Sequence, residues 1–519
     1  MRIRRSTRSA LVAVAVCAVA AGCSSDPAAD FTAIANQPLV ISLDDLLAKT
    51  GGTAAVAIAN PEHGSVSRRT DGALVYTPAA GYTGPDRLEV TTTDAVRLYT
   101  TDIKPLGEFG GVTVQGSAYG SALVPVPGTP GEFYGLTDRG PNVDGKAKNE
   151  KLAVTPDFTP QIARFKLVGN QAVVQSTLLL RTAAGQPFNG LVDLSADTGE
   201  TMKDLNGNVL APTDHGIDSE GLVALPDGTF WVSDEYGPFL VHFDAKGTEL
   251  ERLSPGRGLP GELRLRTPNQ GMEGLTVTPD GATLVGIIQS GLTTAGSTSP
   301  REVPMTRIVT VDLKTKAVKE FAYPLENPKD KLGVSEITAL SNTTFLVDER
   351  DGGKAPKANK KLWTIDISGA TDIGPQSTVA GAKYDPEQGL QIDGKPLETW
   401  VGTVPTADGT AALRKAGITP VTKNLGLDLG GLVDTLNPEG KFFAHDKIEG
   451  VATTDGGKTL YIANDSDFGL EGSKGDQPPY SLKPKTMPNG VQDAGEILAV
   501  DTTRLPAKTE TKTIRLNVQ

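Results

Sequence analysis

Strand–turn–strand units recur along most of this chain. In each unit an apolar or alternating run precedes a turn, often Asp-Gly, and a second apolar run follows it. The clearest copies span residues 220–235, 273–287 and 449–465, with a shorter copy at 336–349 and a degenerate one at 120–139. Asp-Gly between two such runs is a strong hairpin signal. The pattern therefore predicts a series of β-hairpins.

A hairpin of this kind cannot bury both of its faces alone, so successive hairpins must stack. The glutamates that open the four units other than the degenerate one lie 53, 63 and 113 residues apart, and the last gap has room for two units. A radial array of four-stranded blades closes such a set without long exposed edges. We expect an all-β fold with a β-propeller of six blades, or alternatively seven. The strand at 496–501 is expected to complete a blade begun by an N-terminal strand.

A smaller β-rich segment precedes the repeats. Short apolar segments at 39–41, 54–58, 74–76 and 88–90 are separated by Gly and Pro turns, which predicts a β-sandwich over 37–104. The stretches 60–66, 71–78 and 81–86 resemble the Ig-like or cadherin-like modules of bacterial surface proteins. That resemblance implies a spacer or an adhesion unit. Residues 23–36 are rich in Ser, Asp, Ala and Pro and predict a linker, and 105–519 is assigned to the propeller.

The first 22 residues predict a signal peptide. Four arginines precede the apolar run 10–21, which is about half the length of a membrane-spanning helix. The sequence Val19-Ala20-Ala21-Gly22-Cys23 resembles the lipobox of bacterial lipoproteins, which implies a lipid on Cys23. An ordinary signal peptide with an incidental cysteine is the alternative. We expect an exported protein on the outer face of the cell membrane, with the lipid as its sole membrane contact.

The net charge argues against nucleic-acid binding as a function. The formal net charge is −12 and the isoelectric point is about 5.0, and no basic cluster follows residue 8. Phosphate-backbone affinity needs clustered Lys and Arg, so nucleic-acid binding is not expected. The surplus of carboxylates fits solubility, divalent-cation binding, or both. The chain has two cysteines, Cys17 and Cys23, and Cys17 leaves with the signal peptide, so no disulfide is expected.

The repeat places a carboxylate at the same point of each clear unit. These residues are Glu220, Glu273, Glu336 and Glu449, and the second strands of the units end in Asp138, Asp234 with Glu235, Asp348 with Glu349, and Asp465 with Asp467. Equivalent positions of propeller blades converge on one axis, where unpaired carboxylates would repel. A hard cation such as Ca²⁺ relieves that repulsion. The four glutamates are the expected calcium ligands; the alternative is that each bonds backbone amides of the next blade.

Basic residues stand beside these acids. Arg139 follows Asp138, Arg350 follows Glu349, and Lys447 lies two residues before Glu449. Guanidinium and ammonium groups next to a cation would clamp an anionic ester. Internal salt bridges with the neighbouring acids are the alternative.

At this point several motifs resemble a known family. They are Thr137-Asp138-Arg139-Gly140-Pro141-Asn142, Asp218-Ser219-Glu220-Gly221-Leu222, Ser233-Asp234-Glu235-Tyr236-Gly237, Asn269-Gln270-Gly271-Met272-Glu273-Gly274-Leu275, Val347-Asp348-Glu349-Arg350-Asp351 and Lys447-Ile448-Glu449-Gly450-Val451. In order and over about 400 residues, they look like the phytase-like domain family, named for "esterase-like activity of phytase". The resemblance implies a propeller related to the alkaline β-propeller phytases, which use Ca²⁺ to bind phosphate and activate water.

Two functions are compatible with these features. In the first, Ca²⁺ assists hydrolysis of a small anionic ester by a monomer. Asp234, Glu235 or Glu349 would accept the proton from water, Arg139 and Lys447 would stabilise charge, and Arg350 would help to bind substrate. No G-x-S-x-G motif supports a serine hydrolase. In the second, the chain is a non-catalytic envelope module with structural calcium. The substrate itself stays open.

Overall fold

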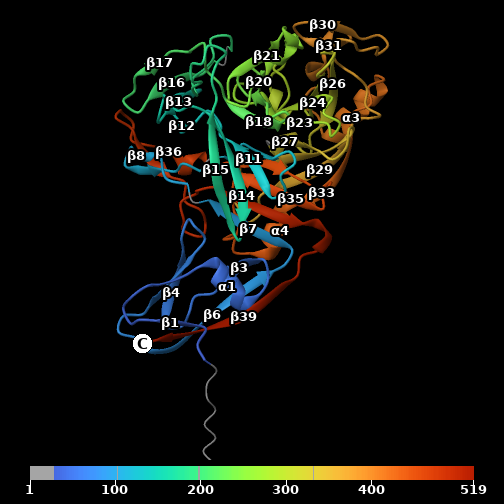
Figure 1. Cartoon of the computed structure of the whole chain (residues 1–519). Coiled ribbons are helices and arrows are strands. Elements are labelled where there is room, and N and C mark those ends of the chain that lie inside the picture. The colour runs from blue at the N-terminus through green and yellow to red at the C-terminus, as the bar shows by residue number, and fades with distance from the viewer. Residues whose placement is uncertain (1–27, 102, 118, 197–198, 331) are drawn as a thin grey trace, which may run out of the picture.

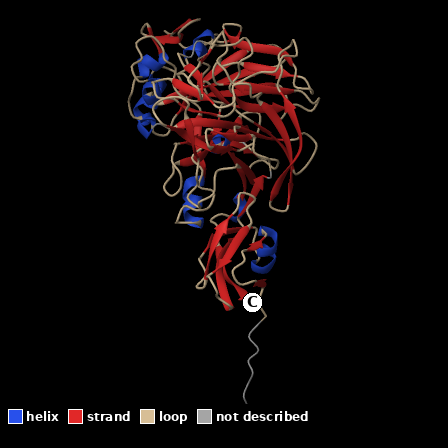
Figure 2. Cartoon of the chain, turned by 90° about the vertical axis from the view of Figure 1, so that its left-hand side faces the viewer, coloured by secondary structure: helices blue, strands red, loops and turns tan. Residues whose placement is uncertain are grey.

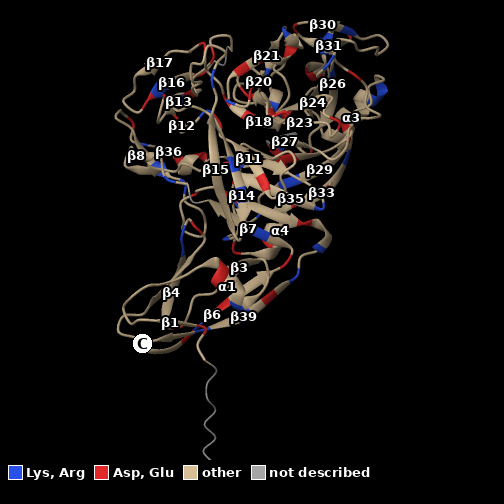
Figure 3. Cartoon of the chain, in the orientation of Figure 1, with Lys and Arg blue, Asp and Glu red and all other residues tan. Residues whose placement is uncertain are grey.

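The computed structural model describes residues 28–101, 103–117, 119–196, 199–330 and 332–519, and they form a small domain and a large ring of β-sheets (Figure 1). The expected signal peptide and Cys23 lie outside the described residues. None of the described helices is both long and apolar enough to cross a membrane. Strands dominate both parts and the helices are few and short (Figure 2). Lys and Arg are interspersed with Asp and Glu over both parts (Figure 3).

The small domain consists of two sheets with a buried core between them. One sheet has the order β1, β39, β6, β3 and the other β2, β5, β4. Their bounds are β1 Phe31–Ala33, β39 Thr509–Val518, β6 Gly84–Thr93, β3 Ala54–Ile58, β2 Leu39–Ile41, β5 Leu74–Pro78 and β4 Gly64–Arg68. Leu46, Tyr76 and Leu88 are fully buried in this core. The expected β-sandwich is present, but β1 begins inside the stretch 23–36 that was expected to be a linker.

A helix that the alternation pattern did not predict covers this domain. Helix α1, Leu43–Thr50, begins where the Oγ atom of Ser42 accepts a hydrogen bond of 3.0 Å from the backbone N–H of Asp45. It ends at Gly51, whose φ of 75° a residue with a side chain rarely adopts.

The C-terminal strand belongs to the small domain, which corrects the expected boundary of the propeller at residue 519. Strand β39 pairs antiparallel with β6 along ten residues and parallel with β1. Its alternate residues Ile514, Leu516 and Val518 are 1–2% exposed and belong to the core of the small domain. Every second residue of β39 is therefore buried against strands from the other end of the chain, more than 400 residues away.

The large part is a propeller-like ring in which the described residues form five sheets of four main strands each. The first strands β10, β18, β23, β27 and β34 contact one another in this order, and β34 contacts β10, so the ring closes. The sheets are β10 Ala122–Pro125, β11 Glu132–Leu136, β14 Gln161–Val168, β15 Gln171–Leu179; β18 Ser219–Ala224, β19 Phe230–Asp234, β20 Leu240–Phe243, β21 Glu249–Pro255; β23 Met272–Val277, β24 Thr283–Ile288, β25 Met305–Asp312, β26 Val318–Pro324; β27 Gly333–Ala339, β28 Thr344–Arg350, β29 Lys360–Asp366, β33 Thr422–Asp428; and β34 Ile448–Ala452, β35 Thr459–Asn464, β38 Glu496–Asp501, β7 Val96–Thr101.

Five sheets correct the expected count of six or seven. The gap of 113 residues between Glu336 and Glu449 was expected to hold an extra blade. It instead holds an insertion between β29 and β33 of the same sheet, followed by one helix. The insertion comprises β30 Lys383–Asp385, β31 Gly389–Ile392, β32 Lys395–Pro396, α2 Leu397–Val401 and α3 Thr406–Lys415, and the helix after β33 is α4 Leu429–Leu436.

The ring closes by pairing its last strand with an N-terminal one, as expected. Strand β38 lies between β35 and β7, with Leu498 opposite Leu98 and both residues buried. Strand β7 was assigned to the small domain from its sequence, so this is a second shift of the boundary. Strand β7 also pairs in parallel with β15, which joins the first and last sheets of the ring at their outer edges.

Short sheets surround one end of the ring. They are β12 Asn142–Asp144, β13 Glu150–Ala153, β16 Thr201–Asp204 and β17 Val209–Leu210; β36 Leu470–Lys474 and β37 Ser481–Pro484; and β8 Gly107–Phe109 and β9 Val112–Val114. Strands β12 and β36 contact each other. Residues from both of them line the cavity described next.

Candidate functional site

A charged cavity of about 490 Å³ is lined by residues from all five sheets of the ring or the loops that follow their strands. Its acidic lining residues are Asp138, Asp144, Asp218, Glu220, Glu235, Glu273, Asp351, Glu449, Asp467 and Glu471, and its basic ones are Arg139, Lys151, Arg301, Arg350 and Lys447. Carboxylates thus outnumber cationic groups ten to five. The cavity is suited to a cation, and an anion can enter it only beside a positive charge.

Three carboxylates form a compact group on one wall. Asp218, Glu220 and Glu235 are buried, and each offers a carboxylate oxygen within 4.8 Å of the other two. Asp218 and Glu220 flank the start of β18, and Glu235 follows the end of β19. Burial raises the pKa of Glu220 and of Glu235 well above the usual range, and the neighbouring carboxylates raise both further. We refer to these three residues as the acidic triad.

A β-bulge places each of the three repeat glutamates that line the cavity. Pairing of β18 with β19 skips Glu220 and Gly221, pairing of β23 with β24 skips Glu273 and Gly274, and pairing of β34 with β35 skips Glu449. An unpaired residue in a bulge can turn its side chain away from the sheet faces. This irregularity aims the repeated glutamates at the cavity.

The glycine after these glutamates allows the sheets to approach closely. A Cβ on Gly221 would lie 2.6 Å from the backbone N of Leu275, and one on Gly274 would lie 2.5 Å from that of Ile337. Both distances are well below van der Waals contact, so a side chain at either position would push neighbouring sheets apart. The Glu-Gly repeat therefore serves close packing of the sheets as well as the placement of a carboxylate.

Glu336 does not join the other three glutamates, which corrects the expectation that all four converge. In β27 the bulge falls on Ser335, one residue earlier, so Glu336 pairs with Asp348 and faces away. Its Oε1 accepts hydrogen bonds from the backbone N–H groups of Ile337 and Leu275 at 2.8 and 3.2 Å. It lines a separate cavity of about 180 Å³. For Glu336, the alternative of a glutamate that bonds backbone amides therefore fits better than a calcium ligand.

Asp234 and Glu349, two of the expected proton acceptors, also lie outside the cavity lining. Asp234 accepts hydrogen bonds from the backbone N–H groups of Asp218 and Gly237 and so shapes the loop that carries Asp218. Burial raises the pKa of Asp234 to about 7. Glu349 accepts hydrogen bonds from Tyr323 and Lys423. Of the three expected acceptors, Glu235 alone lines the cavity.

Arg139 lines the cavity beside the acidic triad. Its Nη1 lies 3.4 Å from Oδ2 of Asp218 and 3.6 Å from Glu200, and its Nη2 donates a hydrogen bond of 2.7 Å to Asn269. Its guanidinium carbon lies 4.9 Å from the centre of the Tyr236 ring. Contacts on several sides fix the position of this guanidinium, and with 6% exposure it is almost fully withdrawn from water.

Arg350 and Lys447 line the cavity at the glutamate of the last sheet. The Nε of Arg350 donates a hydrogen bond of 2.8 Å to Oγ of Ser335, and its Nη2 donates to Glu449. Lys447 pairs with Asp465 and Asp467 at 3.0 and 2.6 Å. The internal ion pairs of the alternative are therefore present, and both residues also line the cavity; that they bind an anionic ester stays a prediction.

Sequence reasoning missed two cavity residues with a direct role in the acidic wall. Asp218 stands two residues before Glu220, in a motif already singled out, but it lies before the strand and so outside the repeat alignment. Gln289 donates from Nε2 to Oε1 of Glu273 and occupies the place after β24 that Glu235 occupies after β19. Alignment of the strand ends across units would have identified Gln289, whereas the positions equivalent to Asp218 hold Gly271, Val334 and Lys447.

Comparisons with known proteins identify both parts of the chain. A family model described as "Phytase-like: Esterase-like activity of phytase" matches residues 115–468, and one described as "Bacterial Ig domain" matches residues 24–103. An "Uncharacterized secreted protein" of Arthroderma benhamiae is 27% identical over 376 residues, which are 61% of this chain and 69% of that protein.

Solved structures with a similar course of the chain are distant. The hydrazine synthase of Kuenenia stuttgartiensis is 12% identical with a TM-score of 0.28, and the match covers 84% of this chain and 98% of that one. A streptogramin B lyase is 9% identical with a TM-score of 0.25, and the match covers 78% and 97%. Likeness at this level says nothing about the cavity.

Proposed function

This chain belongs to the phytase-like family, and from that membership we propose that it is an exported hydrolase of phosphate or other anionic esters, assisted by a divalent cation, with Ca²⁺ the expected ion. The observation that carries the proposal is the acidic triad beside the guanidinium of Arg139, inside one cavity. A cation and an anionic group can therefore occupy adjacent positions.

The donor set fits a hard cation. The acidic triad offers carboxylate oxygens alone, which calcium and magnesium prefer to nitrogen or sulfur ligands. Oδ2 of Asp218 and Oε2 of the nearby Glu273 are buried oxygens without a hydrogen-bond partner among the described residues. Such oxygens are costly unless a charge compensates them. When bound, the cation would polarise an ester oxygen and make a bound water more acidic.

Arg139 and Arg350 are the groups suited to an anionic substrate. Both line the cavity, and both are held by hydrogen bonds, to Asn269 and to Ser335, that leave the guanidinium little freedom to turn. A positive charge fixed before the substrate arrives stabilises the negative charge that develops on ester oxygens during hydrolysis. On this proposal, Arg139 binds the anionic group of the substrate that lies next to the acidic triad, and Arg350 binds anionic oxygens farther from the triad.

Glu273 is the residue suited to accept the proton from the attacking water. It lines the cavity, one of its oxygens receives the hydrogen bond from Gln289, and the other has no hydrogen-bond partner among the described residues. Burial, and then the charge of Glu449, raises the pKa of Glu273 to about 8. A carboxylate that titrates near neutral pH binds and releases a proton readily. This role replaces the one expected of Asp234 and Glu349.

Export and the lipid on Cys23 remain part of the proposal. They rest on the signal-peptide pattern and on the lipobox resemblance of residues 19–23. A relative of this chain is named as a secreted protein, which supports export without bearing on the lipid. The small Ig-like domain would then stand between the membrane surface and the ring.

A hydrolysis assay tests the proposed function. The purified protein should release p-nitrophenol from p-nitrophenyl phosphate or from an acyl ester when Ca²⁺ is present, and a chelator should abolish the release. Readdition of Ca²⁺ should restore it. Inactivity on a broad panel of phosphate and acyl esters, with Ca²⁺ bound, would favour the non-catalytic envelope module instead.

A further inference from the structure

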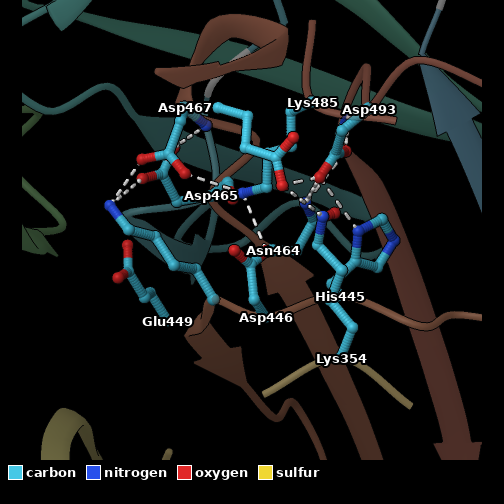
Figure 4. A network of polar contacts seen from close by, with 12 residues as sticks. Lys354, His445, Asp446, Glu449, Asn464, Asp465, Asp467, Lys485 and Asp493 are labelled. Atoms are coloured by element: carbon cyan, nitrogen blue, oxygen red, sulfur yellow. Dashed lines mark hydrogen bonds and ion pairs between the residues drawn. The ribbon is translucent and has the colours of Figure 1, made fainter. Parts of the chain in front are cut away.

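Two lysines, Lys447 and Lys485, lie among carboxylates near the last sheet of the ring, whereas the acidic triad belongs to the second sheet. Nζ of Lys485 lies 2.7 Å from Asp467, 2.8 Å from Asp446 and 3.7 Å from Asp493, and it also contacts the backbone oxygen of Asp465 at 3.4 Å. Figure 4 shows Lys485 between Asp467, Asp446 and Asp493. The side chain of Lys485 is 1% exposed. An ammonium surrounded by oxygens on several sides has the surroundings of a bound cation.

Lys447 continues this arrangement into the cavity itself. Its Nζ lies 2.6 Å from Oδ1 of Asp467 and 3.0 Å from Oδ2 of Asp465. Asp467 therefore offers one carboxylate oxygen to each lysine. The side chain of Lys447 is 34% exposed, so of the two ammonium groups this is the one that faces the cavity.

Further carboxylates surround Lys447 without a direct bond to it. Burial alone would lower the pKa of Lys447, but Asp467, Asp465, Glu449 and Asp138 together raise it well above the usual range. Four carboxylates thus act on one ammonium and favour its charged form.

The wall with the acidic triad has a different electrostatic composition. No described lysine forms an ion pair with Asp218, Glu220 or Glu235, and the contact between Arg139 and Asp218 is a loose one of 3.4 Å. Unpartnered buried oxygens occur on this wall, at Asp218 and Glu273. One side of the cavity therefore has two ammonium groups in close contact with its carboxylates, whereas the acidic triad has only the longer contact with the guanidinium of Arg139.

We propose that Lys447 and Lys485 are built-in cations that replace a second metal ion, so that the cavity binds a single divalent cation, at the acidic triad. Lys447 excludes a second ion from the carboxylates of Asp138, Asp465 and Asp467. The exclusion has a steric and an electrostatic part: the ammonium occupies the position between the carboxylate oxygens, and it repels a dication at close range. The choice of the acidic triad as the first site rests on the proposed function; the role of the lysines does not.

The inference has a consequence for the substrate. An anionic ester bound at the acidic triad would contact the ammonium of Lys447 and the guanidinium of Arg350. These groups would take the place of the second ion of a two-metal hydrolase. One negative oxygen of the ester would lie toward the cation and another toward Lys447. The site thus favours groups with two or more anionic or strongly polar oxygens.

Calcium titration by isothermal calorimetry tests the inference. The wild-type protein is expected to bind about one Ca²⁺ per chain, and Lys447→Met, which keeps the length of the side chain, about two. Lys447→Met combined with Asp465→Asn should return to about one. Lys203→Met is the matched control: Lys203 pairs with Glu150 at 2.6 Å outside the cavity lining, and its removal should leave the wild-type stoichiometry.

Each outcome of the calcium titration either supports or overturns the role of the two lysines. Two ions on the wild-type protein, or a single ion on a folded Lys447→Met protein, would overturn the inference while the proposed cation site stands. No ion on the wild type but one on Lys447→Met would overturn the proposed site and support the inference. If Lys447→Met does not fold, two single variants of the wild-type protein test the inference instead. Asp465→Asn should leave the single site intact, and Asp218→Asn should abolish it. Loss of Ca²⁺ binding in Asp465→Asn would refute the inference.

Discussion

The guanidinium Nη1 of Arg139 lies 3.4 Å from a carboxylate oxygen of Asp218, at a shared wall of the cavity. This contact is too long for a strong hydrogen bond, and both atoms lack a hydrogen-bond partner among the described residues. A buried guanidinium and a buried carboxylate held apart in this way can each bind a ligand of opposite charge without first breaking a tight ion pair.

Replacement of Arg139 should weaken turnover of an anionic ester. Removal of a charge-assisted contact of this kind costs about 1.5–3 kcal/mol, so Arg139→Met should lower kcat/KM for p-nitrophenyl phosphate by about 10- to 100-fold. Arg164→Met, which removes an Arg that pairs with Glu132 away from the cavity lining, serves as the control. Equal kcat/KM values for the wild type and Arg139→Met would show that this guanidinium does not contact substrate.

His445 should make the stability of the ring depend on pH. Its ring nitrogens lie 3.2 Å from Asp493 and 3.0 Å from Glu496. Figure 4 shows His445 beside Asp493. Burial alone would lower the pKa of His445, but the two carboxylates outweigh burial and raise it to about 9. Because the folded pKa lies above the unfolded value, the stabilisation is complete below about pH 6.5 and is lost as the pH rises through 9.

Melting temperatures of His445→Gln against wild type measure this effect. The substitution should cost about 3 kcal/mol at pH 6, and the difference should shrink markedly by pH 9.5. His242→Gln is a suitable control because burial lowers the pKa of His242, which is the opposite direction to the shift of His445. A difference between wild type and His445→Gln that is constant from pH 6 to 9.5 would mean that His445 is neutral in the folded protein.

The C-terminal strand should be essential to the Ig-like domain. Leu516 is 1% exposed in the core of that domain, so Leu516→Ala should destabilise it by about 2–5 kcal/mol and increase its proteolysis. Lys512→Ala on the same strand, whose side chain is 41% exposed, should change stability by less than about 0.5 kcal/mol. An unchanged Leu516→Ala protein would indicate that β39 is dispensable.

Cys23 should carry the lipid. In a bacterial host fed labelled palmitate, the wild-type chain should become labelled and fractionate with membranes, and Cys23→Ala should lose both properties. Cys17→Ala, inside the expected signal peptide, should behave as wild type. Labelling of the Cys23→Ala protein would disprove the lipobox assignment.

Local patterns in the sequence were sufficient for the hairpins. The turns at Asp227, Asp280 and Asp455 each join the first two strands of a sheet in the ring, as the Asp-Gly pattern predicts. The strand at 496–501 pairs with a strand from the N-terminal region, also as expected. These features depend on residues close in sequence, or on edges that must be paired.

Features that depend on one-residue shifts or on distant partners were not predictable in the same way. Glu336 aligns with the other glutamates in sequence, yet a bulge at Ser335 turns it out of the cavity. Strand β39 has an ordinary alternating pattern, and nothing in that pattern distinguishes the edge of the ring from the sheet of the Ig-like domain. The extra blades were inferred from a gap that an insertion fills.

The dependence of p-nitrophenyl phosphate hydrolysis on free Ca²⁺ tests the central claim most directly. For the wild type the initial rate should rise with Ca²⁺ and saturate, and Glu220→Gln should need at least about 10-fold more Ca²⁺ for half of its maximal rate. Glu251→Gln, a partly exposed residue that pairs with Lys316 outside the cavity lining, should match the wild type. A rate that a chelator leaves unchanged, or the same calcium dependence in Glu220→Gln and wild type, would contradict a cation-assisted site at the acidic triad.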